Sequence, residues 1–254
     1  MNTSETKTAI VIGASSGIGR EVARLLMRQG WRLGVAARRE ERLLELQKEA
    51  PETTEVMVLD VTKEDAPERL RQLIARLGHM DLFFYASGIG KQNPTLTEDI
   101  ELRTVETNAL GFTRMIGEAY RYFAARGKGH IAAISSIAGT KGLGPAPSYS
   151  ATKAMQNVYL QALEQQARGR GLHIAFTDIR PGFVDTDLLK GDYRYPLLLN
   201  PRQVAHGIVR AIDRKRHVAV IDWKYRVLTA VWRRIPRFIW RRLPIYDYRA
   251  SREN

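Results

Sequence analysis

The stretch TAIVIGASSGIGREVARLLMRQG, residues 8–30, decides the fold of this chain. A short β-branched run, TAIVI, leads into a turn of pattern G-x-x-x-G-x-G, formed by Gly13, Gly17 and Gly19. Apolar residues then recur at spacings of three and four, which predicts an amphipathic helix. Glycines at a strand-to-helix turn let the backbone approach a pyrophosphate, whose charge lies at the positive end of the helix. We therefore predict a dinucleotide-binding turn; a purely structural turn is the alternative.

Strand-like and helix-like sequence patterns continue to alternate along the chain. Short apolar runs, expected to be strands, occupy residues 8–12, 31–37, 55–60, 81–86, 130–135, 173–179 and 217–222. Longer segments with helical periodicity separate them. Near-continuous apolar strands alternating with amphipathic helices predict a parallel sheet covered on both faces. We expect one doubly wound α/β domain of seven strands over residues 1–222, without an internal boundary.

One segment inside this domain departs from the alternation. Residues 182–200 are irregular and lie between the sixth strand and the helix that opens at Pro201. An irregular insertion of this length is more often a functional lid than a connector. Its apolar residues suit a hydrophobic substrate, although they could also pack against the core; they are Leu188, Leu189, Tyr193, Tyr195 and residues 197–199.

Composition restricts the chemistry. Hydrophobic residues make up 44% and charged residues 26% of the 254 residues, ordinary proportions for a globular protein. The absence of cysteine excludes disulfides, thiolate metal sites and cysteine nucleophiles, and we predict no metal site. The sequence opens without a charged-then-apolar secretory segment and contains no apolar stretch of about 20 residues, so we expect a cytoplasmic protein.

The end of the second strand carries the information on cofactor choice. Sites for NAD usually have an Asp or Glu there, whereas an arginine suits the 2′-phosphate of NADP. Here the strand ends in Ala-Ala-Arg38-Arg39, with no carboxylate before Glu40. Arg38 is predicted to bind the phosphate through a forked, charge-assisted contact, unless both arginines simply begin a solvated helix. After the third strand, Asp60 is placed to accept a hydrogen bond from the adenine amino group or to cap a helix.

A tyrosine and a lysine define the predicted chemistry. Tyr149 and Lys153, in SSIAGTKGLGPAPSYSATK (residues 135–153), lie one helical turn apart on one face. A free phenol has a pKa of about 10, too high for efficient proton exchange at neutral pH, and a nearby ammonium favours the phenolate. Ser136 follows the fifth strand, where open parallel sheets bind their ligands. Its hydroxyl is placed to hold a substrate oxygen against Tyr149, which supplies the proton that hydride transfer to a carbonyl requires.

Together these motifs resemble the short-chain dehydrogenase/reductase family. They are the glycine turn, Asn108 in ETNALG, Ser136, Tyr149-x-x-x-Lys153 and the run from Pro181 to Thr186, and they cover about residues 7–222. The resemblance implies a Rossmann-type sheet of order 3-2-1-4-5-6-7, with Tyr149 as acid/base. It also implies that Lys153 binds the nicotinamide ribose and lowers the pKa of Tyr149, and that Asn108 anchors a water that passes protons to Lys153. The residues expected to bind the cofactor are Gly13, Ser15, Ser16, Gly17, Ile18, Gly19, Arg38, Asp60, Val61, Gly88, Asn108, Tyr149, Lys153, Pro181, Gly182 and Thr186.

Two positions depart from the family pattern. Ile12 precedes the first glycine, where the family usually has threonine, so a hydroxyl contact is lost. The family's Asn-Asn-Ala-Gly segment after the fourth strand is Tyr85-Ala86-Ser87-Gly88. Amide bonds that brace the central strands must therefore be missing or replaced. Neither change touches a predicted catalytic residue.

Beyond residue 222 the resemblance explains nothing. Residues 223–254 hold nine Lys/Arg and two Asp/Glu, out of a net charge of +13 for the whole chain. Their apolar residues recur at helical spacing, and Pro236 separates two patches of them. The apolar residues are Val227, Leu228, Val231, Trp232, Ile235, Phe238, Ile239, Trp240 and Leu243. Five arginines lie among them: Arg233, Arg234, Arg237, Arg241 and Arg242. This pattern is typical of a helix at a membrane surface, which we expect for residues 223–243, or of a segment packed as core, lid or dimer contact. Nucleic acid is not expected, because basic residues elsewhere are balanced by acids.

These observations predict an NADP(H)-dependent oxidoreductase acting on the carbonyl or alcohol of a hydrophobic, lipid-, acyl- or steroid-like substrate. A non-catalytic NADP(H) sensor and a membrane-recruited scaffold on the same fold are the alternatives. The family resemblance further suggests a homodimer or homotetramer formed through helices around residues 97–126 and 148–168. The sequence names neither the substrate nor the physiological direction.

Overall fold

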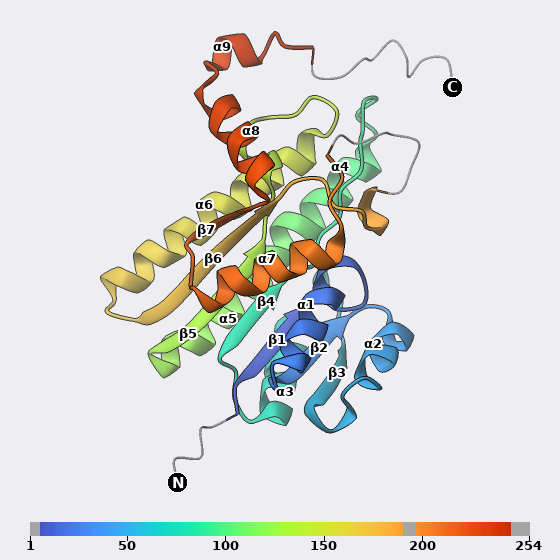
Figure 1. Cartoon of the computed structure of the whole chain (residues 1–254), viewed down its shortest axis with the longest axis vertical. Helices are drawn as coiled ribbons and strands as arrows, with labels where there is room; N and C mark the ends of the chain where they lie inside the picture. Colours follow the sequence, from blue (N-terminus) through green and yellow to red (C-terminus); the bar gives the residue numbers. More distant parts are fainter. Residues whose placement is uncertain (1–5, 190–196, 245–254) are drawn as a thin grey trace.

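The structure, a computed structural model, describes residues 6–189 and 197–244. Its described part contains one parallel sheet of order β3-β2-β1-β4-β5-β6-β7 (Figure 1). This confirms the predicted doubly wound Rossmann-type sheet. The register is regular: Val11 of β1 lies between Val35 of β2 and Phe84 of β4.

The strands agree closely with the apolar runs of the sequence. Their bounds are β1 (Thr8–Ile12), β2 (Arg32–Ala37), β3 (Thr54–Val58), β4 (Leu82–Tyr85), β5 (Lys128–Ile134), β6 (His173–Pro181) and β7 (Val218–Ile221). The helices are α1 (Gly17–Arg28), α2 (Glu40–Gln47), α3 (Ala66–Leu77), α4 (Glu98–Val105), α5 (Phe112–Arg126), α6 (Pro147–Gly169), α7 (Pro201–Asp213), α8 (Trp223–Arg234) and α9 (Arg237–Trp240). A π-helical segment, η2 (Glu106–Gly111), joins α4 to α5, and a 3-10 helix, η3 (Ile137–Thr140), follows β5.

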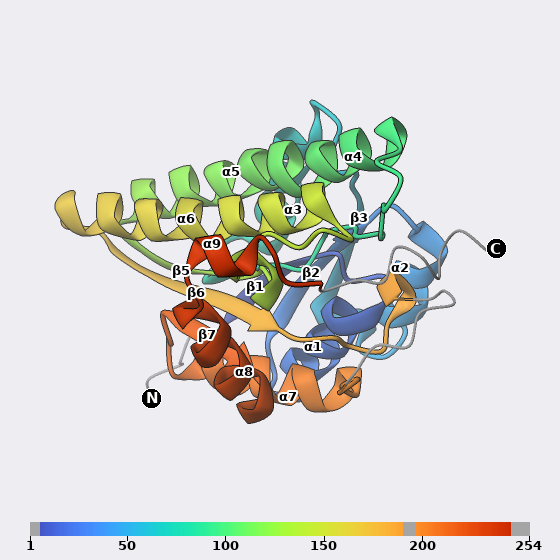
Figure 2. The same cartoon turned by 90° about the horizontal axis from the view of Figure 1, so that it is seen from above.

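Two hydrophobic cores sandwich the sheet. Figure 2 shows α3, α5 and α6 on one face and α1, α2 and α7 on the other. Because both faces are covered, every residue of β1 and β4 is buried. One core contains Phe83, Tyr85 and Phe112, and the other contains Val11, Leu26 and Ile208. The sheet is therefore a rigid base from which the loops at its carboxyl edge project.

The C-terminal helices lie outside these two layers. Helix α8 begins directly after β7, and Figure 1 shows α8 and α9 at the same end of the molecule as α4. Within residues 223–244 only Tyr225 and Thr229 are buried. No helix in the described ranges has the length and hydrophobicity needed to cross a bilayer.

Candidate active site

Four connections at the carboxyl edge of the sheet bring the predicted residues together. The glycine turn follows β1, Gly88 follows β4, Ser136 follows β5, and Pro181 ends β6. In a parallel sheet these ends share one edge, where open α/β sheets bind their ligands. The site is thus assembled from segments that are far apart in sequence.

The glycine turn is packed too tightly for side chains. Gly13 has φ +87°, and a Cβ there would lie 2.8 Å from the backbone of Ala86 and Ser87. A Cβ on Gly19 would overlap the carbonyl oxygen of Gly13. Helix α1 begins at Gly17 with no acidic residue in its first turn. The turn therefore presents backbone N–H groups and a positive helix end, which fits a pyrophosphate.

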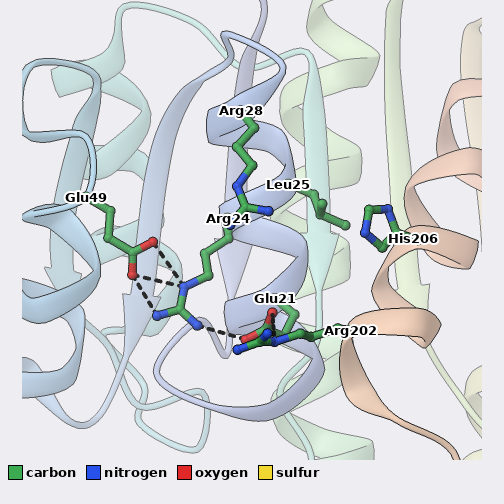
Figure 3. Close-up of a pocket in the computed structure, with 7 residues that line it drawn as sticks. All are labelled: Glu21, Arg24, Leu25, Arg28, Glu49, Arg202 and His206. Atoms are coloured by element: carbon green, nitrogen blue, oxygen red, sulfur yellow. Dashed lines mark hydrogen bonds and ion pairs between the residues drawn. The ribbon is translucent and has the colours of Figure 1, made fainter.

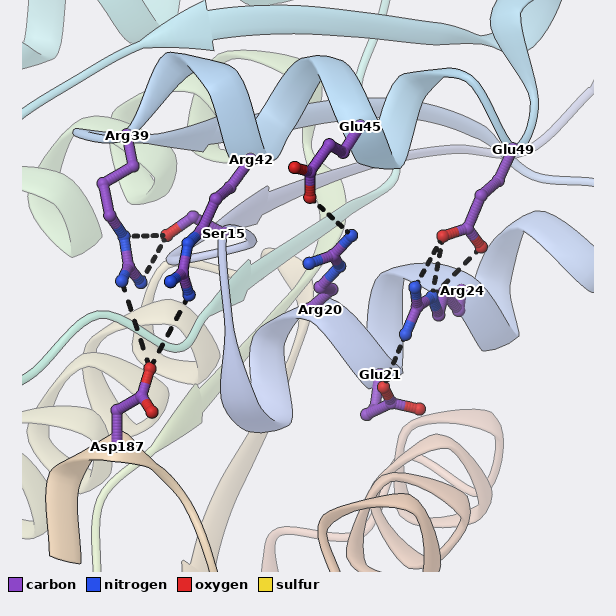
Figure 4. Close-up of polar contacts among 9 residues, drawn as sticks. All are labelled: Ser15, Arg20, Glu21, Arg24, Arg39, Arg42, Glu45, Glu49 and Asp187. Atoms are coloured by element: carbon purple, nitrogen blue, oxygen red, sulfur yellow. Dashed lines mark hydrogen bonds and ion pairs between the residues drawn. The ribbon is translucent and has the colours of Figure 1, made fainter. Parts of the chain in front are cut away.

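The arginine that reaches this turn is Arg39, not Arg38. Its Nη2 donates hydrogen bonds to the hydroxyls of Ser15 at 3.0 Å and Ser16 at 2.6 Å, as Figure 4 shows for Ser15. Asp187, from the segment after β6, lies 4.0 Å from Arg39 and 3.7 Å from Arg42. Arg38 is exposed. Arg39 therefore contacts the turn, and the predicted contact of Arg38 with the cofactor phosphate stays a prediction.

Asp60 and Val61 line the next part of the same edge. One carboxylate oxygen of Asp60 accepts hydrogen bonds from the N–H of Thr62 at 3.0 Å and from its hydroxyl at 2.9 Å. The cap of α3 is Asp65, so the alternative that Asp60 caps this helix is wrong. Val61 is buried where η2 comes closest, since a Cβ on Gly111 would lie 2.9 Å from its carbonyl oxygen. Contact of Asp60 with adenine stays a prediction.

Tyr149 and Lys153 lie together, as their spacing on α6 predicts. The Nζ of Lys153 is 5.7 Å from the centre of the Tyr149 ring. That ring covers the loop after β4, because a Cβ on Gly90 would lie 2.7 Å from its Cε2. A Cβ on Gly88 would lie 3.6 Å from the Lys153 Nζ. Phenol and ammonium therefore face the carboxyl edge side by side.

Lys153 is a buried cation with neutral close partners. Its side chain is only 4% exposed, and its Nζ donates to the Ile134 carbonyl at 3.1 Å and to Gln156 Oε1 at 3.0 Å. Burial lowers the pKa of Lys153 to about 8, and the charge of Asp178 opposes this shift in part. The ammonium is thus poised to change its charge near physiological pH.

Asn108 is held by the loop that follows β4. Its side chain accepts from the Ile89 N–H at 2.9 Å and donates to the Ile89 carbonyl at 2.7 Å. Its own backbone carbonyl accepts a hydrogen bond from Gln156 Nε2 at 2.7 Å. Gln156 thus connects Asn108 to Lys153 directly, and the water at Asn108 that the resemblance implies stays a prediction. Sequence reasoning missed Gln156, although a glutamine one turn after the lysine was the available signal.

Ser136 is nearly buried at the end of β5. Its Oγ accepts from the Ala138 N–H at 3.0 Å and so caps η3, while its hydroxyl keeps a proton to donate. The neighbouring Ser135 hydrogen-bonds Asp178, whose other carboxylate oxygen accepts from Arg180 Nη2 at 2.6 Å. This charged network beneath the site was not predicted, because β6 reads as an ordinary apolar strand.

The segment after β6 contacts both the glycine turn and the C-terminal tail. A Cβ on Gly17 would lie 3.2 Å from the methyl group of Thr186, so Thr186 lies beside the glycine turn. Gly182 lies under the ring of Tyr225 in α8, which leaves no room for a Cβ. Of the predicted lid, Val184 pairs with Leu199 as an isolated bridge. Tyr193 and Tyr195 lie outside the described residues.

The C-terminal tail contacts the rim of the site, which is formed by the loop at residues 141–142 and by residue 197 of the predicted lid. Lys141, five residues after Ser136, donates to the Ile235 carbonyl at 2.8 Å. Trp240 Nε1 donates to the Gly142 carbonyl at 2.7 Å, and the Tyr225 hydroxyl donates to the Leu197 carbonyl at 3.1 Å. One side of the tail therefore packs on the domain, as the packing alternative expected, and the membrane-surface interpretation stays a prediction.

A pocket with a volume of about 310 Å³ lies between α1 and α7 (Figure 3). At its wall Arg24 pairs with Glu49 at 2.7 Å and with Glu21 at 2.8 Å. Among the described residues, no group of three His, Cys, Asp or Glu is arranged to hold a metal ion.

Fold and site together define an oxidoreductase of the dinucleotide-binding α/β class. The family model for short chain dehydrogenases matches residues 7–194. An uncharacterized oxidoreductase of Myxococcus xanthus is 33% identical over 237 residues, covering 91% of this chain and 93% of the relative. A glycine betaine reductase of Emericella nidulans is 35% identical over 233 residues, covering 84% of this chain but 18% of that longer protein.

Solved structures agree with this. A variant of actinorhodin polyketide ketoreductase with NADPH superimposes with a TM-score of 0.74 at 26% identity, covering 87% of this chain and 97% of that one. A short-chain dehydrogenase from Streptomyces avermitilis, 23% identical, shares the fold with a TM-score of 0.79 and covers 90% of this chain. The chain belongs to the short-chain dehydrogenase/reductase family, whose members use NAD(P)H to interconvert carbonyl and alcohol groups.

Proposed function

We propose that this protein is an NADP(H)-dependent oxidoreductase that acts on the carbonyl or alcohol of a hydrophobic substrate. The observation that carries the proposal is the pairing of Tyr149 with a cation that is almost completely buried one helical turn away. A scaffold or sensor without turnover has no use for a phenol beside a cation whose pKa burial brings to about 8. The family membership of the chain adds independent support.

The residues of the site fit a dinucleotide, and different groups of them suit its pyrophosphate and its reacting end. The glycine turn, with its tightly packed Gly13 and Gly19 and the N-terminus of α1, suits the pyrophosphate. When bound, the nicotinamide supplies or accepts the hydride. During reduction, negative charge develops on the substrate oxygen, and Tyr149 donates its phenolic proton to that oxygen. Lys153 favours the phenolate that remains, and the Ser136 hydroxyl orients the oxygen.

A preference for NADP(H) rests on the cations at the corner after β2. Arg39 lies on the glycine turn, Arg38 is exposed beside it, and Arg42 follows one helical turn later. The first carboxylates after β2, Glu40 and Glu41, lie in the first turn of α2. A guanidinium pairs with a phosphate through two parallel hydrogen bonds and offers nothing comparable to a ribose hydroxyl. The corner therefore suits a 2′-phosphate.

The hydrophobic character of the substrate is inferred from exposed leucines in the predicted lid. Leu188, Leu197 and Leu198 expose between 39% and 49% of their surface, before and after residues 190–196 of the predicted lid. Exposed leucines of this kind lose contact with water when an apolar molecule binds, which favours apolar over charged substrates.

We further propose that the exposed side of the tail binds an anionic membrane surface. Trp223, Val227 and Val231, four residues apart on α8, are 57–61% exposed. Seven cations and no carboxylate accompany them between residues 223 and 244. A two-fold contact with a second copy would place this basic surface against itself, whereas acidic lipid headgroups complement it. The tail would then place the rim of the site beside the source of an apolar substrate.

Sedimentation with lipid vesicles tests this surface. The intact chain should pellet with vesicles containing phosphatidylglycerol and not with pure phosphatidylcholine. Replacing Trp223, Val227 and Val231 together by serine should reduce the bound fraction about tenfold, because exposed apolar area is lost. Leu44→Ser, on exposed α2, is the control. Equal pelleting of the triple variant and the intact chain contradicts the proposal.

A homodimer through the face formed by α4 and α6 is our proposal for assembly. Leu102, Val105 and Val158 are exposed there, between 45% and 65%. Light scattering of the intact chain should give twice the mass of one chain, and Val158→Asp should halve it because a charge would be buried in the contact.

Tyr149→Phe decides between the enzyme and the sensor. The enzyme loses NADPH oxidation with every ketone that the intact chain reduces, and NADPH binding persists because the ring is retained. A screen over ketones of increasing chain length and ring number, with NADPH and NADH side by side, supplies the substrate. Unchanged turnover in the Tyr149→Phe variant would reject the proposed chemistry.

A further inference from the structure

The buried side chain of Gln156 lies between two residues of the predicted site. It is fully buried on α6, one turn after Lys153. Its Oε1 accepts from Lys153 Nζ at 3.0 Å, and its Nε2 donates to the Asn108 backbone carbonyl at 2.7 Å. One amide therefore connects the ammonium to η2.

The two partners determine which way the amide points. An ammonium only donates hydrogen bonds, and a backbone carbonyl only accepts them. Rotating the amide by half a turn would place an NH2 group against the ammonium and an oxygen against the carbonyl, both unfavourable in a buried site. The oxygen of Gln156 is consequently held towards the Lys153 ammonium.

A neutral acceptor has a particular effect on a buried cation. The groups that face Lys153 are Tyr149 from its own helix, the Ile134 carbonyl from β5 and the Asp178 carboxylate from β6, and Arg180 already pairs with that carboxylate. Gln156 adds a dipole without adding a charge. The dipole holds the ammonium in place, while its charge stays uncompensated and remains available to the phenol beside it.

We propose that Gln156 is a positioning residue that fixes the Lys153 ammonium beside Tyr149 and joins it to the Asn108 backbone carbonyl. The inference rests on the proposed function, because it assigns Lys153 the task of favouring the Tyr149 phenolate. It differs from the arrangement that the family resemblance implies, in which a water at Asn108 passes protons to the lysine. In this chain an amide, which does not titrate at physiological pH, accepts from the lysine and donates to that carbonyl directly.

Two variants of opposite effect test the proposal. Gln156→Met keeps the shape but removes the acceptor, so the pKa of Lys153 should fall by about one unit. Gln156→Glu places a carboxylate beside the ammonium, so the pKa of Lys153 should rise by at least about one unit. The same substitutions at Gln161, exposed on the same helix, are the controls and should leave Lys153 unchanged.

The pKa is measured directly, by NMR titration of the intact protein labelled with 13C at the lysine ε-carbon, with the Lys153 signal assigned from Lys153→Arg. Melting curves establish that both variants are folded; if one is not, the other still decides. This readout needs no substrate, so it distinguishes failure of this inference from failure of the proposed reaction. Once a substrate is found, the upper limb of the pH profile of kcat/KM should move with the pKa. A Lys153 titration that stays within about 0.3 units in every folded Gln156 variant overturns the proposal.

Discussion

The two ends of the predicted cofactor site differ in the exposure of their positive charges. At the glycine turn, Arg39 and Arg42 are 41–42% exposed and share the half-exposed carboxylate of Asp187 at 3.7–4.0 Å. At the other end, Lys153 is 4% exposed, and its close partners are a carbonyl and an amide. Exposed cations keep their charge and exchange partners at little cost in free energy. The stability of a buried cation depends strongly on each of its neighbours.

The difference matches what each end has to do. The proposed binding of a phosphate needs permanent charges, and Asp187, which lies beside both arginines, is an anion that a phosphate could replace (Figure 4). Lowering the pKa of a phenol requires one cation in one place and no screening by water. Four experiments, in order of decreasing effect, break or sharpen this comparison.

Removing the buried cation should have the largest effect. Lys153→Met is expected to reduce kcat by about a thousandfold, since the phenolate of Tyr149 loses the charge that favours it. NADPH oxidation measured at saturating substrate is the test. Lys128→Met, at the exposed start of β5, should leave kcat unchanged. A loss of less than about tenfold in Lys153→Met would remove the distinction between the two ends.

The buried cation should also give the reaction its pH dependence. The pKa of Lys153 is lowered from 10.5 to about 8, so the free enzyme loses this charge as the pH rises through 8. We expect kcat/KM for carbonyl reduction to fall above about pH 8, by about tenfold per unit. Stability moves the other way: between pH 8 and 10.5 the unfolded chain binds more protons, so the free energy of unfolding rises relative to Lys153→Met, by about 3 kcal/mol at most. Urea unfolding of both proteins across this range checks the sign.

At the exposed end, a single arginine should matter less. Arg39→Gln is expected to weaken NADPH binding about tenfold and to leave NADH binding within about twofold, because only NADPH carries the 2′-phosphate. Fluorescence titration with both cofactors measures it, with Arg38→Gln as the matched neighbour. An equal loss for both cofactors would mean that Arg39 supports the glycine turn through Ser15 and Ser16 instead of reading the phosphate.

Salt should produce the smallest effect and separate the two ends most clearly. Raising KCl from about 0.05 to 0.5 M is expected to weaken NADPH binding a few-fold, because exposed charges are screened. The midpoint of the pH profile should move by less than about 0.3 units, because water and ions do not reach Lys153. A midpoint that shifts as strongly as the affinity would contradict the burial of that side chain.

Much of the molecule was predictable because local sequence and fold agree. All seven strands lie within three residues of the apolar runs, since buried parallel strands need continuous apolar side chains. The glycine turn and the Tyr149–Lys153 pair follow from local rules of backbone shape and helical spacing. The choice between Arg38 and Arg39 did not follow, because one residue of difference at a strand end reverses the direction of the side chain.

The sequence by itself determined the sheet order, through the family resemblance, and the identity of the groups that are proposed to transfer the proton. Only the tertiary structure decided their surroundings: Gln156 between Lys153 and Asn108, Asp178 beneath them, and Tyr225 of the tail against Gly182. These contacts join residues that are up to 48 positions apart in the chain, and β5, β6, η2 and α6 bring them together. Periodicity reports which side of its own helix or strand a residue occupies. Its partner on the neighbouring element is set by packing, and here that packing determines the charge of the lysine.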